Sequence, residues 1–230
     1  MSRDHTVRSY DQELNSLKSK ILEMGKAAEE QLAKAIEALI TKDNKLAVNV
    51  IYTDSQVNDL QNVIDRLTVR MLAVRQPMGS DLRHIISALK MAAELERIAD
   101  YAANIAKNGM NLNQVYLEKP VRLIIHMAEL DIQMLKDMIG AYLELNIPKA
   151  IEVWHRDEEI NQIYADLLTQ LRSYMKADSD NIDTYTSLIF TARCCERIGD
   201  HIKNLAEGVY FIIHGDSTID PPMDKKQHVG

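Results

Sequence analysis

The sequence is poor in the two residues that break helices. Glycine and proline account for only 8 and 5 of its 230 residues, about half their usual share. A turn-rich all-β fold needs more of both, whereas a chain that is 46% hydrophobic with long intervals between breakers favours long helices. The composition therefore predicts an all-α protein.

Other shortages exclude whole classes of protein. The only cysteines, Cys194 and Cys195, are adjacent, and neighbours on a helix do not face each other, so a disulfide framework is excluded. The 27 basic and 34 acidic residues give a net charge of −7, which argues against nucleic-acid binding. No uncharged apolar stretch approaches the roughly 18 residues of a membrane span, and the N-terminus lacks a secretory signal. We expect a cytoplasmic protein that reaches membranes only peripherally, through partners.

Apolar residues recur every three or four positions through six segments of about 30 residues each, which is the pattern of amphipathic helices. Polar or helix-breaking residues separate the segments at 41–44, 77–79, 111–118, 146–148 and 178–180. Long helices joined by short connections run antiparallel to their neighbours, as in bundles. The first two apolar series are Leu14, Leu17, Ile21, Met24, Ala28, Leu32, Ala35 and Leu39, then Val50, Val57, Leu60, Ile64, Leu67, Met71 and Val74.

The second half of the chain repeats the first. Segment Glu96–Ala106 matches Glu196–Ala206 at an offset of 100, with six of eleven residues identical. Upstream, Asp54–Asn58 matches Asp157–Asn161 at an offset of 103. Two matches with nearly equal offsets indicate a duplication. We therefore predict six long antiparallel helices that form two tandem, pseudo-symmetric three-helix bundles.

The breaks set the expected boundaries of these bundles. The first repeat should span residues 8–111 and the second residues 119–215, with a polar linker between them. Residues 216–230 contain two adjacent prolines, five charged residues and no apolar period. Such a segment cannot bury enough apolar surface to fold, so it is expected to be a disordered tail.

Each repeat carries a Glu and an Asp four residues apart, one turn above the other on one helical face. Like charges at this spacing repel by a few tenths of a kcal/mol on a lone helix. One interpretation is an exposed acidic strip in which Arg97 and Arg197 balance the acids. The other is a hard-cation site, because Glu, Asp and Asn oxygens suit Mg, Mn, Ca or iron. The candidate metal ligands are Glu96, Asp100, Glu196, Asp200, Asp54, Asp157, Asn58 and Asn161.

Two further patterns allow functional interpretations that we consider weaker. Glu152 and His155 fit the Glu-x-x-His element of carboxylate-bridged di-iron enzymes, but those enzymes need the element twice, and the position equivalent to His155 is Tyr52. Arg83, in the first turn after the Pro77 break, could hold an anion, although a structural salt bridge with Asp81 or another helix is the stronger expectation. No Gly-rich phosphate loop, nucleophile elbow or zinc finger occurs, so an enzyme is not indicated.

The doubled Glu-Arg-Ile-x-Asp motif, each copy followed by Asn, is preceded by Arg75-Gln-Pro-Met-Gly-Ser-Asp-Leu-Arg83. This combination resembles the PhoU family, accessory proteins of bacterial phosphate-specific transport, over about residues 10–215. One departure is Ala99, where the family usually has Gly; the second copy keeps Gly199. The resemblance implies paired three-helix bundles, a homodimer and no enzymatic activity.

The same resemblance implies a function. PhoU-like proteins act as negative regulators when phosphate is plentiful. They are thought to couple the ATPase subunit of the phosphate ABC transporter to the phosphate-sensing histidine kinase and to limit phosphate uptake. The family associates its acidic motif with metal, which here implicates the Mg, Mn or Fe class of ions at the eight candidate ligands.

Overall fold

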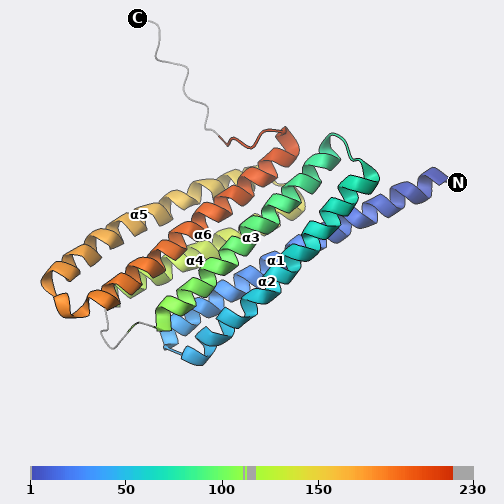
Figure 1. Ribbon diagram of the computed structural model, residues 1–230. Coiled ribbons are helices and arrows are strands. Elements are labelled where there is room, and N and C mark those ends of the chain that lie inside the picture. The colour runs from blue at the N-terminus through green and yellow to red at the C-terminus, as the bar shows by residue number, and fades with distance from the viewer. Residues whose placement is uncertain (1, 111, 113–117, 220–230) are drawn as a thin grey trace, which may run out of the picture.

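Six α-helices account for nearly all of the described chain. The computed structural model describes residues 2–110, 112 and 118–219, and the side chains from residue 10 onward. A short 3-10 helix, η1 (Ser179–Asn181), precedes the last helix, and no strand occurs within these ranges. The helices are α1 (Ser2–Thr41), α2 (Asn44–Arg75), α3 (Ser80–Met110), α4 (Glu118–Glu144), α5 (Ile147–Ala177) and α6 (Ile182–His214). The all-α prediction is confirmed (Figure 1).

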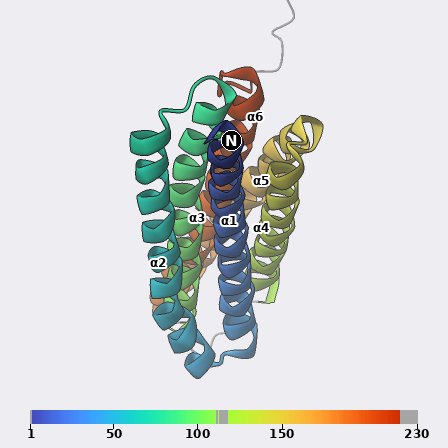
Figure 2. The same cartoon turned by 90° about the vertical axis from the view of Figure 1, so that its right-hand side faces the viewer.

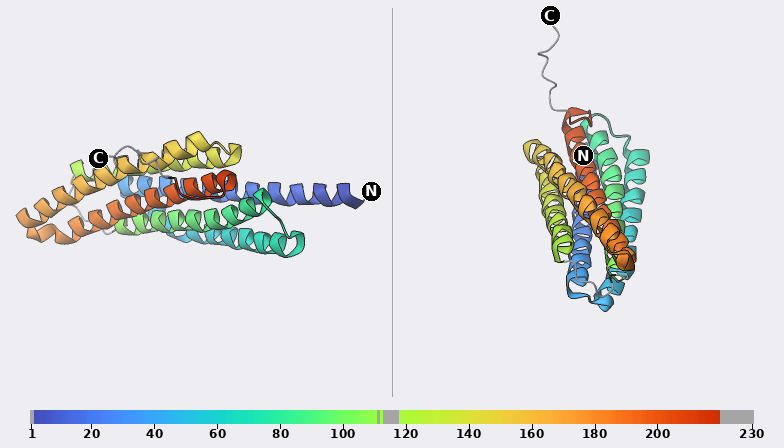
Figure 3. Two further views of the ribbon diagram at one scale, coloured as in Figure 1. Left: turned by 90° about the horizontal axis from the view of Figure 1, so that it is seen from above. Right: turned by 90° about the vertical axis from the view of Figure 1, so that its left-hand side faces the viewer.

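The helices pack as two bundles of three. Helices α1, α2 and α3 contact one another, as do α4, α5 and α6. The bundles meet mainly where α3 packs against α6, with a second contact between α1 and α4 (Figure 2). The first helix continues beyond the other five at one end of the body (Figure 3). The contact between α3 and α6 therefore lies in the middle of the structure, between the two repeats.

Equivalent turns join the first two helices of each bundle. Lys42 and Leu145 both adopt positive φ, 55° and 52°, a common way to end a helix. The next residue in each turn, Asp43 or Asn146, caps the following helix with its side-chain oxygen, which accepts from Lys45 and Leu46 in one case and from Lys149 in the other. These caps satisfy main-chain N–H groups that would otherwise lack partners.

The core follows the duplicated apolar pattern. Every residue of the first apolar series, which lies on α1, is buried except Leu14. The buried positions of α1 recur in α4 at an offset of 103. In α2 the fully buried apolar positions are seven residues apart, from Val50 to Met71. Leu60 and Leu67 flank them and are half-buried. Val74 occupies the same flanking position in the last turn of α2, at the end of the bundle, where it is 66% exposed.

The predicted tail falls mostly outside the described residues. Of residues 216–230, the structure describes 216–219, which form no helix. Ile219 in this short stretch is 7% exposed and belongs to the apolar core. The beginning of the predicted tail is therefore packed on the body.

Two helical glycines test how closely α1 and α4 pack. A Cβ on Gly25 would lie 2.5 Å from Ile139 Cδ1, whereas a Cβ on Gly140 would meet nothing within 4 Å. We expect Gly140→Ala to raise the free energy of unfolding by about 0.5–1 kcal/mol through helix propensity. We expect Gly25→Ala to lower it by about 1 kcal/mol, because Ile139 is overpacked. Urea unfolding of both variants checks this, and an equal gain from both would contradict the close contact.

Candidate functional site

The packing of α3 on α6 brings the duplicated acids into one region. We call Glu96 and Asp100 the first acidic motif, and Glu196 and Asp200 the second. Arg83 Nε donates to the Ile212 carbonyl at 2.8 Å, and further along α3 the Glu94 carboxylate lies 2.7 Å from His201 Nδ1. The higher-numbered residue of α3 thus contacts the lower-numbered residue of α6, so the two helices run antiparallel. Continued along both helices, this register places the two motifs at the same level of the contact between α3 and α6.

Each acidic motif is paired with the arginine inside it. Arg97 lies 3.7 Å from both Glu96 Oε2 and Asp100 Oδ2. In the second motif, Arg197 lies 3.4 Å from Glu196 Oε2 and 3.0 Å from Asp200 Oδ2. The Asp side chains are more than one third exposed, whereas the Glu side chains are only 20% and 15% exposed. The structure thus contains a partly exposed acidic strip balanced by arginine, as the first interpretation describes.

Burial, followed by repulsion from neighbouring acids, raises the pKa values of Glu96, Asp100 and Glu196. The pKa of Glu96 is raised by burial and by Asp100 and Asp54, against the attraction of Arg97. Burial and then Asp54 raise the pKa of Asp100. The pKa of Glu196 is likewise raised, first by burial. Carboxylates that repel one another in this way gain from a cation that neutralises them.

The predicted contribution from α2 is present in the first repeat. The Asp54 carboxylate accepts from Asn58 Nδ2 at 3.4 Å and from Gln31 Nε2 at 3.2 Å. Gln31, on α1, also donates to the Ala99 carbonyl at 3.2 Å, which ties all three helices together. Sequence reasoning missed Gln31 because it is a single polar residue in an apolar series and has no counterpart in the repeat.

In the second repeat the equivalent residues lie deeper. Asp157 is 1% exposed, and its Oδ2 accepts from Asn161 Nδ2 at 2.8 Å and lies 3.6 Å from Lys203 Nζ. Burial raises the pKa of Asp157, and the charge of Lys203 opposes that shift. Lys203 also lies over the Trp154 ring, 4.4 Å from its centroid. Asp54 and Asp157 are thus equivalent in sequence but differ in environment.

The eight candidate ligands form pairs and strips within each repeat. Among the described residues, no group of three or more His, Cys, Asp or Glu side chains is arranged to hold a metal ion. In this conformation Arg97 and Arg197 supply the positive charge beside the acidic motifs. A metal ion at either motif would have to displace that guanidinium group.

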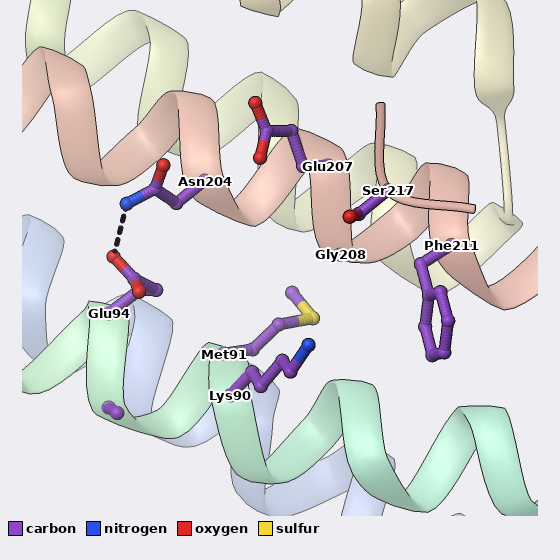
Figure 4. A pocket seen from close by; sticks show the side chains of 9 residues that line it. Lys90, Met91, Glu94, Asn204, Glu207, Gly208, Phe211 and Ser217 are labelled. Carbon is purple, nitrogen blue, oxygen red and sulfur yellow. Dashed lines mark hydrogen bonds between the residues drawn. The ribbon is translucent and has the colours of Figure 1, made fainter. Parts of the chain in front are cut away.

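The seam between the repeats also contains a cavity of about 360 Å³ between α3 and α6. Lys90, Glu94, Asn204 and Phe211 are among its lining residues, and Asn204 Nδ2 donates to Glu94 at 2.9 Å (Figure 4). Burial raises the pKa of Glu94, but hydrogen bonds from His201 and Asn204 outweigh burial and lower it overall. Sequence reasoning missed Glu94 because its position in the second repeat is occupied by Cys194.

The turn before α3 has a structural role. Arg75 forms a two-pronged contact with Glu13 of α1, with Nε to Oε2 at 2.9 Å and Nη2 to Oε1 at 3.1 Å. Arg83 reaches α6 through its bond to the Ile212 carbonyl. Arg83 thus contacts another helix, as expected, but through a main-chain oxygen and not through the expected salt bridge.

The Glu-x-x-His element lies on the outside of α5. Glu152 and His155 are both exposed, and Glu152 is held by Arg156 and by Lys149. Di-iron bundle sites require such residues to point into the core. Within the described residues, no helix has an apolar stretch long enough to cross a membrane.

Comparison with known proteins gives matches over nearly the whole chain. The family model described as the PhoU domain matches twice, at residues 21–109 and 124–209. A phosphate-specific transport system accessory protein PhoU homolog of Caulobacter vibrioides (strain NA1000 / CB15N) is 40% identical, covering 96% of this chain and 97% of the relative. The accessory protein PhoU of Escherichia coli (strain K12) is 34% identical, covering 92% and 88% of the two chains.

Solved structures agree with these sequence matches. The crystal structure of the phosphate transport system regulatory protein PhoU from Streptococcus pneumoniae superposes with a TM-score of 0.85 at 31% identity, covering 91% of this chain and 99% of that one. PhoU from Pseudomonas aeruginosa gives 0.83 at 34% identity, with 90% and 99% covered. The duplicated family match coincides with the two bundles.

The Glu94 contact gives a pH-dependent prediction. A carboxyl whose folded-state pKa is lowered stabilises the fold above its unfolded pKa, and the effect disappears as pH falls through the folded pKa. We expect Glu94→Gln to lower the free energy of unfolding by about 1 kcal/mol at pH 7 and to have little effect near pH 3. Denaturant unfolding at both pH values checks this, with the exposed Glu129→Gln as control. A loss that is equal at both pH values would contradict a role for the ionised carboxylate.

Proposed function

This chain belongs to the PhoU family, and on that premise we propose that it is a non-enzymatic accessory and regulatory protein of phosphate transport. The observation that carries this proposal is the match, over at least nine tenths of the chain, to relatives named phosphate-specific transport system accessory proteins. The described structure presents surfaces and carboxylates to which a partner or an ion can bind. The Glu-x-x-His element that would favour a di-iron enzyme is exposed on α5.

Its specific role is that of a negative regulator of the phosphate-starvation response and of phosphate uptake. One face docks on the ATPase subunit of the phosphate ABC transporter and another on the phosphate-sensing histidine kinase. The state of the transporter then changes the kinase by shifting the populations of bound partners. The protein acts in the cytoplasm as a homodimer and reaches the membrane through these partners.

The acidic motifs form the surface that a metal ion completes. Asp100 and Asp200 are each more than one third exposed, so both motifs are accessible to an ion or a partner. The carboxylates would hold a hard cation such as Mg, Mn or Fe in place of Arg97 or Arg197. The pKa values of Glu96 and Glu196 are raised first by burial and then by Asp100 and Asp200, and a cation would offset that repulsion. The freed arginine then faces the partner.

Deletion of the gene tests the regulatory role. We expect constitutive expression of alkaline phosphatase in phosphate-rich medium, because the kinase is no longer held inactive. Reporter activity in the deletion strain, with and without a plasmid-borne wild-type copy, provides the measurement. Normal repression in the deletion strain would rule out negative regulation.

A quadruple Ala variant tests the acidic motifs. We expect replacement of Glu96, Asp100, Glu196 and Asp200 to reduce recovery of both partners in pull-down at least tenfold, because the partner-facing surface loses its carboxylates and any cation. The matched control removes four exposed acids elsewhere, namely Glu23, Glu37, Glu129 and Asp166. Unchanged recovery of both partners by the motif variant would contradict the proposal, provided that its helical content equals that of the control.

A further inference from the structure

The first helix extends beyond its neighbour in the first bundle. Helix α1 has 40 residues and α2 has 32, and the turn at Lys42 and Asp43 joins them into an antiparallel pair. Counted back from this turn, Arg75 at the end of α2 comes level with residue 10 of α1, and its contact with Glu13 fits this register. Residues 2–9, which we call the overhang, therefore project past the turn between α2 and α3 (Figure 1, Figure 3).

The apolar stripe of α1 continues into the overhang. Val7, Tyr10 and Leu14 follow the three-and-four spacing of the buried series that continues from Leu17. Tyr10 and Leu14 are only half-buried against the body. Most helical stability in proteins comes from packing of an amphipathic face, and a short stretch of helix gains little from propensity alone. A neighbour that covers this stripe would therefore stabilise the overhang.

A cavity of about 480 Å³ lies at the base of the overhang. Its lining combines Tyr10, Asp11 and Leu14 of α1 with Pro77 and Met78 of the turn between α2 and α3. Met78 is 83% exposed, so an apolar side chain forms part of an open rim. Because Tyr10 and Leu14 belong to both, the cavity and the stripe are continuous, and together they form a groove that suits a second helix.

The overhang and the cavity carry opposite charges. In the sequence, residues 2–9 contain two arginines and one aspartate. The cavity is lined by two acids, Asp11 and Asp81, and by Arg75, which is already paired with Glu13. Opposite charges on two surfaces favour their association. Because α1 is one continuous helix, the overhang leads away from the cavity of its own chain, so this attraction acts between chains.

The spacing of the stripe suits a second copy of this chain. Positions 3, 7, 10 and 14 are separated by four, three and four residues, so the pattern reads the same in both directions. Two antiparallel copies of α1 therefore bring position 7 opposite position 10, and position 3 opposite position 14. Each pairing occurs twice about a two-fold axis, which is the symmetry of most dimers.

We propose that two copies of this chain associate through α1, with the overhang of each bound in the cavity of the other. Val7 packs on the partner's Tyr10. The aliphatic stem of Arg3 packs on the partner's Leu14, and its guanidinium group reaches the partner's Asp11, one turn away. The inference rests on the homodimer of the proposed function and names its interface, and it requires neither acidic motif.

Sedimentation equilibrium of the full-length chain tests this interface. Val7→Asp places a charge in the apolar stripe beyond the turn between α2 and α3. We expect it to raise the dissociation constant of the dimer at least about tenfold, with unchanged helical content. Val48→Asp is the matched control, because it makes the same exchange at an exposed valine near the opposite end of α2. It should associate as tightly as the wild type.

Reversal of the charges gives an independent readout. Arg3→Glu and Asp11→Lys should each weaken the dimer by about fivefold, because each places like charges together at both ends of the interface. The variant that combines the two exchanges restores opposite charges and should regain the affinity of the wild type. A combined variant that is weaker than either single variant would overturn the pairing of Arg3 with Asp11.

Three results would overturn the inference. If Val7→Asp dimerises as tightly as the wild type, the interface is wrong and the homodimer of the proposed function still holds. If the wild type is monomeric at every concentration measured, both the interface and the homodimer are wrong. If a monomeric wild type recovers a protein partner in pull-down and Val7→Asp does not, the groove binds that partner and not a second copy. The alkaline phosphatase reporter tests the regulatory role separately from all three.

Discussion

The antiparallel packing of α3 against α6 is the constraint on which the rest of the structure depends. It joins the two bundles by their most extensive helix contact, and polar bonds such as Ser87 Oγ to the Gly208 carbonyl at 3.1 Å hold its register. Antiparallel packing of duplicated helices sets equivalent segments opposite each other. Two acidic motifs that are 100 residues apart in sequence therefore lie at the same level of this contact.

The two repeats solve the same packing problem with different chemistry. In the first, Gln31 donates to Asp54 and to the carbonyl of Ala99, so the buried polar atoms are matched within the chain. In the second, Gly199 makes room for Asp157, and three buried oxygens of Asp131 and Asp157 have no donor among the described residues. Duplication preserved the backbone and the apolar core, while the polar residues diverged.

The acids of the two motifs and the buried aspartates of the second bundle differ in how their charge is balanced. The motif acids are paired with Arg97 and Arg197 at 3.0–3.7 Å, close enough to attract but partly open to solvent. Such contacts contribute little to stability, so exchanging an arginine for a cation or a partner costs little. The buried pair in the second bundle differs, because a carboxylate inside a core must be neutralised for the fold to be stable.

The sequence by itself determined the helices, their breaks, the duplication and most of the core, because amphipathic periodicity and capping residues such as Asp43 act locally. It also identified the motif acids, since a repeated pattern is visible without a structure. It did not reveal Gln31, Glu94 or Asp131, each of which has no matching residue in the other repeat. Their roles depend on which side chains from distant helices meet, and only the packing of the six helices decided that, because burial and hydrogen-bond partners are properties of the assembled core.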